Sequence, residues 1–113
     1  MEEAKVLEEM KRLAGTQTEK NLRAAFAGES QAHVKYNLFA AEAEKDPSIS
    51  RQIADIFRET GANEKAHAKL WFWLVGDLKK TTAENLKMAA AGENGDWTSM
   101  NPEIAATAEK EGF

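Results

Sequence analysis

The sequence of 113 residues contains no cysteine. This absence excludes disulfide bonds, thiolate zinc sites, iron–sulfur clusters and a catalytic thiol, and it suits a cytoplasmic protein. Long apolar runs are also lacking, because the longest, 70–75, is far too short to span a membrane. Residues 1–5 have neither a basic start nor an apolar core, so we expect no signal peptide. The net charge of −4 argues against a nucleic-acid or anionic-membrane partner.

Proline and β-branched residues are scarce, whereas alanine, glutamate and lysine are abundant. This composition favours an all-helical chain. Gly95 and Pro102 should weaken or bend the last helix. The spacing of apolar residues predicts a short N-terminal helix within 1–15, then a domain over 16–113 whose helices lie at about 16–45, 48–75 and 81–111.

Polar residues at fixed spacing mark where the long helices begin. Capping boxes of the form Thr-x-x-Glu occur at 16–19 and at 81–84, just before apolar periodicity sets in. The helix between them has two candidate caps, Asp46 and Ser48, and Pro47 suits a position in its first turn. The sequence therefore predicts three independently capped long helices.

A nine-residue segment occurs twice. Residues 21–29 and 85–93 lie 64 positions apart and are identical at six of nine positions. By this offset, a copy of the 48–75 helix would begin near Phe113, where the sequence stops. We interpret the chain as one and a half helical hairpins, and we expect the missing half to carry a second E-x-x-H motif, about 64 residues past Glu64.

Four ionisable residues fall within the apolar stripes of the predicted helices. A buried, unpaired carboxylate costs several kcal/mol, so such a group must be protonated, paired with a base or bound to a cation. Arginine and lysine do not share these stripes near the glutamates. Gly28 and Gly92, which precede two of the glutamates, would let a neighbouring helix approach closely. The four residues are Glu29, Glu64, His67 and Glu93.

The spacing of Glu64 and His67 is the most informative feature, because residues three apart share one helix face. Di-iron and di-manganese bundles use one Glu from each of two helices and one E-x-x-H from each of the other two. An isolated E-x-x-H more often reflects a surface Glu and a core His, but its placement in the apolar stripe and the repeated Ala-Gly-Glu favour a metal site here. His33 suits packing or support of a ligand. Tyr36 is either a core tyrosine or a hydrogen-bond donor to a metal-bound carboxylate. The apolar run 71–75 is expected to contribute to the core and to a subunit contact.

Three segments together resemble rubrerythrins. The resemblance covers about Thr16 to Phe113, nearly the whole chain, and implies an all-α, ferritin-like four-helix bundle. It also implies a non-haem site of two iron ions that reduces hydrogen peroxide with electrons from an external redox protein. Manganese or zinc could replace the iron. The matching segments are Ala25–Ala32, Asn63–Lys69, and Gly92–Met100 followed by Glu109–Phe113.

The same resemblance implies the roles of single residues. Asp96 stands where the family has a redox-mobile glutamate, and it is one methylene shorter. Tyr36 matches a catalytic-site tyrosine that supports the ligands, whereas Asn101 replaces the tyrosine usual before this proline. The rubredoxin domain and the fourth bundle helix have no counterpart in the sequence. The residues that match iron ligands are Glu29, Glu64, His67 and Glu93.

Helix lengths lead to a hypothesis about assembly. The 48–75 helix would be roughly 40 Å long, whereas the connector 76–80 would reach at most ~18 Å. We therefore expect a domain-swapped homodimer, in which the last helix packs on the partner's hairpin. Three functions stay open: a peroxidase of rubrerythrin type, a ferritin-like module that binds or oxidises iron, and a non-catalytic helical assembly unit.

Overall fold

The computed structural model describes residues 2–113, which contain helices and turns and no strand. Their contacts divide the chain into two compact units, one that ends at Asp77 and one that runs from Leu78 to Phe113. No helix among the described residues is long and apolar enough to cross a membrane. The helices of the first unit are α1 (Glu3–Met10), the 3-10 helix η1 (Lys11–Leu13), α2 (Gln17–Lys45) and α3 (Arg51–Leu74).

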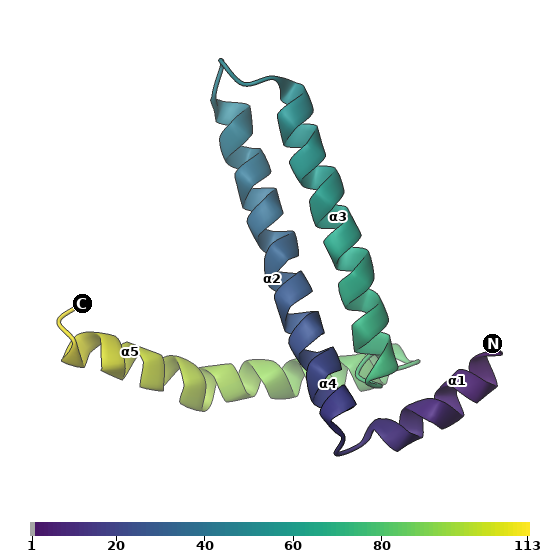
Figure 1. The fold of residues 1–113 in the computed structure, drawn as a ribbon. Coiled ribbons are helices and arrows are strands. Elements are labelled where there is room, and N and C mark those ends of the chain that lie inside the picture. Colours follow the sequence, from purple (N-terminus) through teal and green to yellow (C-terminus); the bar gives the residue numbers. More distant parts are fainter. Residues whose placement is uncertain (1) are drawn as a thin grey trace. The chain divides into compact units, whose positions relative to one another are not determined.

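Helices α2 and α3 lie side by side as an antiparallel hairpin (Figure 1). The threonine of the first capping box caps α2, because the Thr16 side chain accepts a hydrogen bond from the Glu19 backbone N–H at 3.1 Å. Gly15 precedes this cap with φ +77°, a conformation that glycine adopts without strain. This turn separates η1 from α2.

The start of α3 corrects the sequence prediction. The cap is Ser50, whose hydroxyl accepts from the Gln52 N–H at 3.1 Å, and not Asp46 or Ser48. The Asp46 carboxylate instead accepts from the N–H and the hydroxyl of Ser48, at 2.9 and 2.6 Å. Since these two bonds build the turn, Asp46 and Ser48 are engaged with each other, and α3 begins at Arg51.

Small residues form the seam between α2 and α3. The buried apolar side chains of the described residues are all alanines, Ala40, Ala54 and Ala68. Gly61 is also buried, and a Cβ at this position would lie 3.3 Å from Tyr36 Cβ and 3.4 Å from the His33 carbonyl oxygen. The expected close approach at Gly28 is not found within the hairpin, because an added Cβ there would meet nothing within 4 Å, whereas the same expectation for Gly92, in the second unit, stays a prediction. Gly61 is therefore the glycine of the hairpin at which α2 and α3 pack closely.

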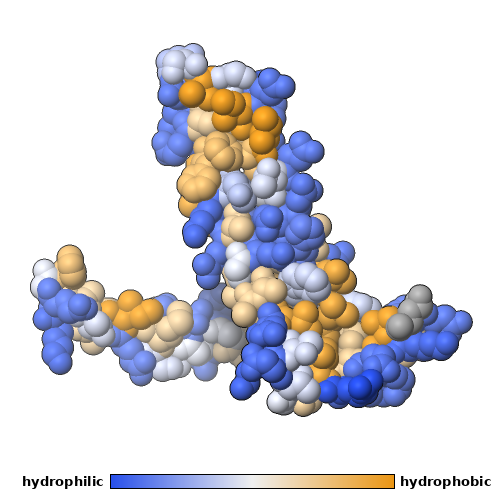
Figure 2. Space-filling view, viewed as in Figure 1, coloured by the Kyte–Doolittle hydropathy of each residue, from blue (hydrophilic) through white to orange (hydrophobic). Residues whose placement is uncertain are grey.

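Aromatic rings extend this seam along the hairpin. Phe26 of α2 stacks on Phe72 of α3 with ring centroids 4.8 Å apart. Nearer the turn, the Phe57 ring lies 5.6 Å from that of Phe39 and 6.2 Å from that of Tyr36. Apolar side chains remain at the surface around the α2–α3 turn (Figure 2), where Ile49, Ile53 and Phe39 are exposed.

The second unit is a single helical rod interrupted by a π-helix: α4 (Thr82–Gly95), η2 (Asp96–Met100) and α5 (Asn101–Lys110). Helix α4 is capped as predicted, because the Thr81 side chain accepts a hydrogen bond from the Glu84 N–H at 3.2 Å. The expected weakening of this last helix takes the form of the π-helix η2, which ends at Met100, two residues before Pro102. Proline has no N–H and its ring clashes with the carbonyl four residues back, so a wider turn relieves both problems. No residue of these three helices is buried, and Trp97 is 78% exposed.

Candidate metal centre

Three of the predicted ligands meet on one side of the hairpin. Glu29 comes from the middle of α2, and Glu64 and His67 come from successive turns of α3. Each residue offers one ligand atom, and these atoms all lie within 4.8 Å of one another. Atoms bound to one ion at about 2.0–2.2 Å lie roughly 3 to 4 Å apart, so small side-chain rotations would bring the three onto one cation.

Glu29 gives the clearest sign that a cation belongs here. Its side chain is only 26% exposed, and its Oε1 lies 3.6 Å from Nδ1 of His67, too far for a hydrogen bond. Its other oxygen, Oε2, is buried and has no hydrogen-bond partner among residues 2–113. Leaving a buried charged acceptor unpaired costs at least about 1–3 kcal/mol. A bound cation would remove this cost, so the residues present fit a metal.

His67 provides the open edge of the cluster, since its side chain is 56% exposed. The other two members, Glu29 and Glu64, are half-buried. Two carboxylates and one imidazole form a donor set that suits iron, manganese or zinc. The arrangement thus combines an anionic, partly enclosed interior with a side from which a small molecule can enter.

His33 lies one turn after Glu29 and is committed to packing. Its Nδ1 lies 2.7 Å from the Gly61 carbonyl oxygen, which can only accept, so Nδ1 carries the proton and donates. Its Nε2 lies 3.3 Å from Nδ2 of Asn37, which donates to it. Because both ring nitrogens are occupied, His33 holds α2 to the backbone of α3 and is not a ligand.

Tyr36, predicted to support the ligands, is half-buried two turns after Glu29. Its ring meets Phe39 edge-on at 6.1 Å and lies 6.2 Å from Phe57, beside the close approach at Gly61. This packing fixes the ring on the hairpin. The role of its hydroxyl at a metal-bound carboxylate stays a prediction.

Trp71 is a feature that the sequence did not single out at this site. It follows His67 by four residues on α3, and its indole Nε1 is buried without a hydrogen-bond partner among the described residues. A helical spacing of four places it on the same side of α3 as His67. The only sequence signal was a tryptophan in the apolar stripe, which equally indicates a core residue.

Glu93 and Asp96 belong to the second unit, where Glu93 lies in α4 and Asp96 opens η2. Glu93 is exposed and Asp96 is half-exposed. The group of three ligands found among residues 2–113 does not include either residue. Metal ligation by Glu93 and Asp96 therefore stays a prediction.

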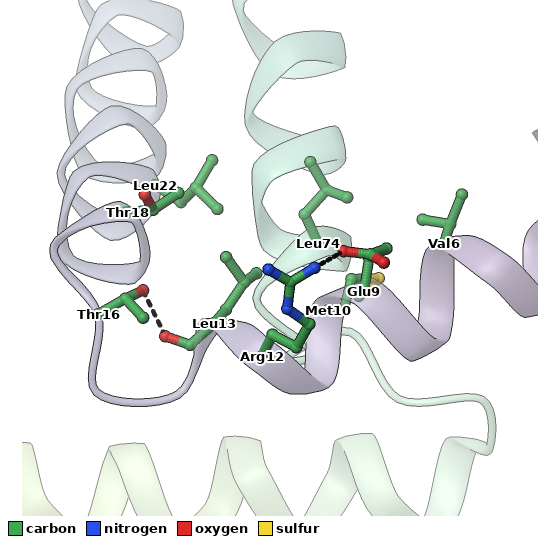
Figure 3. A pocket seen from close by; sticks show the side chains of 9 residues that line it. All are labelled: Val6, Glu9, Met10, Arg12, Leu13, Thr16, Thr18, Leu22 and Leu74. Atoms are coloured by element: carbon green, nitrogen blue, oxygen red, sulfur yellow. Dashed lines mark hydrogen bonds and ion pairs between the residues drawn. The ribbon is translucent and has the colours of Figure 1, made fainter.

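A separate cavity of about 440 Å³ lies in the first unit, between η1, the start of α2 and the end of α3 (Figure 3). Apolar side chains point into it, among them Leu13, Leu22 and Leu74, and the ion pair of Glu9 and Arg12 lies at its side. It contains none of the ligand residues, so it is not the metal centre.

Comparison with known proteins identifies the family. The Rubrerythrin family model matches residues 20–113. The chain belongs to the rubrerythrin family. It is 47% identical to a rubrerythrin of Porphyromonas gingivalis over 91% of this chain. It is 44% identical to a rubrerythrin of Nitratidesulfovibrio vulgaris, and 42% identical to Rubrerythrin-1 of Clostridium acetobutylicum, each over 92% of this chain.

Membership confirms the predicted family and the all-α, ferritin-like fold. The rubrerythrin family normally binds a non-haem di-iron centre, and the cluster of Glu29, Glu64 and His67 offers ligands of the right kind for one. The chain spans 56% of the length of the P. gingivalis relative and 60% of that of the N. vulgaris relative.

Proposed function

We propose that this rubrerythrin-family chain is a non-haem di-iron peroxidase, which reduces hydrogen peroxide to water with electrons from an external redox protein. The observation that carries the proposal is the cluster of Glu29, Glu64 and His67, with a buried carboxylate oxygen that has no partner among residues 2–113. The reaction consumes one peroxide, two electrons and two protons and yields two water molecules. A cytoplasmic location belongs to the same proposal.

The side chains of the hairpin would hold and shape the centre. With two irons bound, the site would supply the two electrons needed to cleave the O–O bond. Glu29 and Glu64 offset the positive charge of the ions, and Tyr36 would orient a metal-bound carboxylate by a hydrogen bond. The half-buried position of the two glutamates limits access by water. The exposed edge at His67 leaves a path for peroxide.

Self-association is part of this proposal, because large apolar residues stay exposed on both units: Leu38, Ile56, Leu86, Trp97 and Ile104. The sequence predicts a domain-swapped dimer, in which Glu93 and Asp96 of one chain reach the hairpin of the other. Helix α3 has 24 residues, about 36 Å, whereas the segment between Leu74 and Thr82 would extend to about 25 Å. The swapped arrangement and its ligands stay predictions.

The peroxidase proposal is tested by loading the metal-free protein with Fe²⁺ under anaerobic conditions and mixing it with hydrogen peroxide or with O₂. We expect iron oxidation, followed by absorbance, to be at least ten times faster with peroxide. Oxidation that is no faster with peroxide contradicts the peroxidase and favours a ferritin-like module that binds or oxidises iron. Glu64→Ala should abolish the reaction, whereas Glu59→Ala, an exposed glutamate on the same helix, should not.

A further inference from the structure

Two buried polar atoms of the hairpin lack a hydrogen-bond partner, and they are chemically complementary. Oε2 of the Glu29 carboxylate can only accept a hydrogen bond, whereas the indole Nε1–H of Trp71 can only donate one. Within residues 2–113, these are the buried side-chain nitrogen and oxygen atoms left without a partner. Each unpaired group costs about 1–3 kcal/mol, and a charged one costs more. A hydrogen bond between the two would remove both costs.

Contacts between α2 and α3 place Trp71 close to the level of Glu29. The Glu29 carboxylate lies 3.6 Å from the His67 ring, and the Phe26 ring stacks on that of Phe72 with centroids 4.8 Å apart. Since Trp71 falls between His67 and Phe72 on α3, it lies opposite the stretch of α2 from Phe26 to Glu29. That stretch rises by about 4.5 Å, less than one helical turn.

The two side chains also lie on the same side of the hairpin and lean toward each other. Trp71 follows His67 by four residues and Glu64 by seven, so it continues the line of ligands along α3. Side chains of a helix lean toward the N-terminus of that helix. Because α2 and α3 are antiparallel (Figure 1), Glu29 leans toward the level of Trp71, and Trp71 leans back toward the level of Glu29.

We propose that Trp71 is a positioning residue of the metal centre: when a cation binds Oε1 of Glu29, the indole N–H of Trp71 donates a hydrogen bond to Oε2. This inference rests on the proposed function in assigning a metal to Glu29. The ligand atoms of the cluster lie within 4.8 Å of one another and must turn to reach one ion. The terminal torsion of a glutamate permits this turn, because its energy minimum is broad. The new bond then fixes the plane of the carboxylate, as hydrogen bonds to metal ligands do.

The assignment gives the two oxygens of Glu29 different tasks. Oε1 is the oxygen beside His67 and faces the other ligands, whereas Oε2 is the buried one. Trp71→Phe keeps an aromatic ring in the packing and removes only the donor. Trp73→Phe is the matched control, because residues two apart on a helix do not face the same side.

The test uses protein with ¹⁵N-labelled tryptophan and Zn²⁺, which has no redox chemistry. The sequence contains three tryptophans, and the indole signal missing from the NMR spectrum of Trp71→Phe identifies Trp71. Adding Zn²⁺ should shift this indole proton downfield and slow its exchange with water, whereas the indole of the exposed Trp97 should keep its signal. Trp71→Phe should weaken Zn²⁺ binding about tenfold or more, and Trp73→Phe should leave it unchanged. Circular dichroism checks that each variant stays helical.

The outcomes separate this inference from the function on which it rests. If the wild-type protein binds no metal ion, the metal centre fails, and the proposed function and the role of Trp71 fail with it. If Zn²⁺ binds but the Trp71 indole signal does not respond, only the positioning role is wrong. The same holds if Trp71→Phe binds Zn²⁺ as tightly as Trp73→Phe.

Discussion

The two copies of the nine-residue repeat, 21–29 in α2 and 85–93 in α4, have nearly the same sequence and different surroundings. Both helices begin with a threonine cap. In the first copy Phe26 stacks on Phe72, and Glu29 is half-buried beside two further ligands. In the second copy alanine replaces that phenylalanine, and Glu93 is exposed. The repeat therefore specifies a capped helix, whereas the packed partner helix turns a glutamate into part of a site.

The largest expected effect comes from breaking that packing at Gly61. Gly61→Val would force its side chain against Tyr36 and Asn37, both 3.3 Å from an added Cβ. We expect a loss of about 2–3 kcal/mol in the free energy of unfolding, with loss of metal binding because α3 moves away from Glu29. Gly92→Val, where nothing lies within 4 Å, should change stability by at most ~0.5 kcal/mol. Equal effects in denaturant titrations would show that the close approach is not important.

The second prediction sharpens the contrast between the two glutamates. Glu29→Leu removes a carboxylate with a buried, unpartnered oxygen, so the metal-free protein should become more stable, by about 1 kcal/mol, while metal binding is lost. The equivalent change in the second copy, Glu93→Leu, should shift stability by less than ~0.5 kcal/mol. Denaturation in a chelator measures both variants, and destabilisation by Glu29→Leu would contradict a carboxylate that is kept for metal.

The helix caps probe whether the two units unfold together. Thr16→Ala removes the bond to the Glu19 N–H and should lower the stability of the hairpin by about 1 kcal/mol. Thr81→Ala removes the matching bond to the Glu84 N–H and should speed amide exchange only in the first turn of α4. A fall in hairpin stability on Thr81→Ala would instead mean that α4 is thermodynamically coupled to the hairpin.

The smallest effect is expected at the α2–α3 turn. The hydroxyl and the N–H of Ser48 hold the pKa of Asp46 below its ordinary value of 3.8. A lowered folded-state pKa adds stability that is present above the unfolded pKa and is lost as pH falls through the folded value. Acidification should therefore loosen this turn before the helices melt, seen as a shift of the Ser48 amide signal in NMR titrations. Asp46→Asn should abolish that titration.

Much of this account could be predicted from local sequence. Helical spacing placed Glu29, Glu64 and His67 on apolar faces, and the threonines at 16 and 81 cap their helices as the Thr-x-x-Glu pattern predicts. These features depend on residues within one or two turns of each other, so the sequence alone is enough to identify them.

Features that depend on a second element were missed or misplaced. Within the hairpin the sequence pointed to Gly28, because it precedes a glutamate, whereas the close approach is at Gly61, which only the pairing of α2 with α3 decides. The cap of α3 moved to Ser50 because Ser48 engages Asp46. The sequence predicted a weakened or bent helix near Pro102. It did not predict the π-helix, in which the backbone N–H of Asn101 bonds the carbonyl of Asp96, five residues back.

The central claim is that Glu29, Glu64 and His67 hold metal on one face of the hairpin. The most direct test measures metal per chain in the purified protein by elemental analysis, beside Glu64→Ala and its control Glu59→Ala. We expect stoichiometric metal, at least one ion per chain, in the wild type and in Glu59→Ala, and a loss of most of it in Glu64→Ala. Equal metal content in all three proteins, or none in the wild type, would contradict the account.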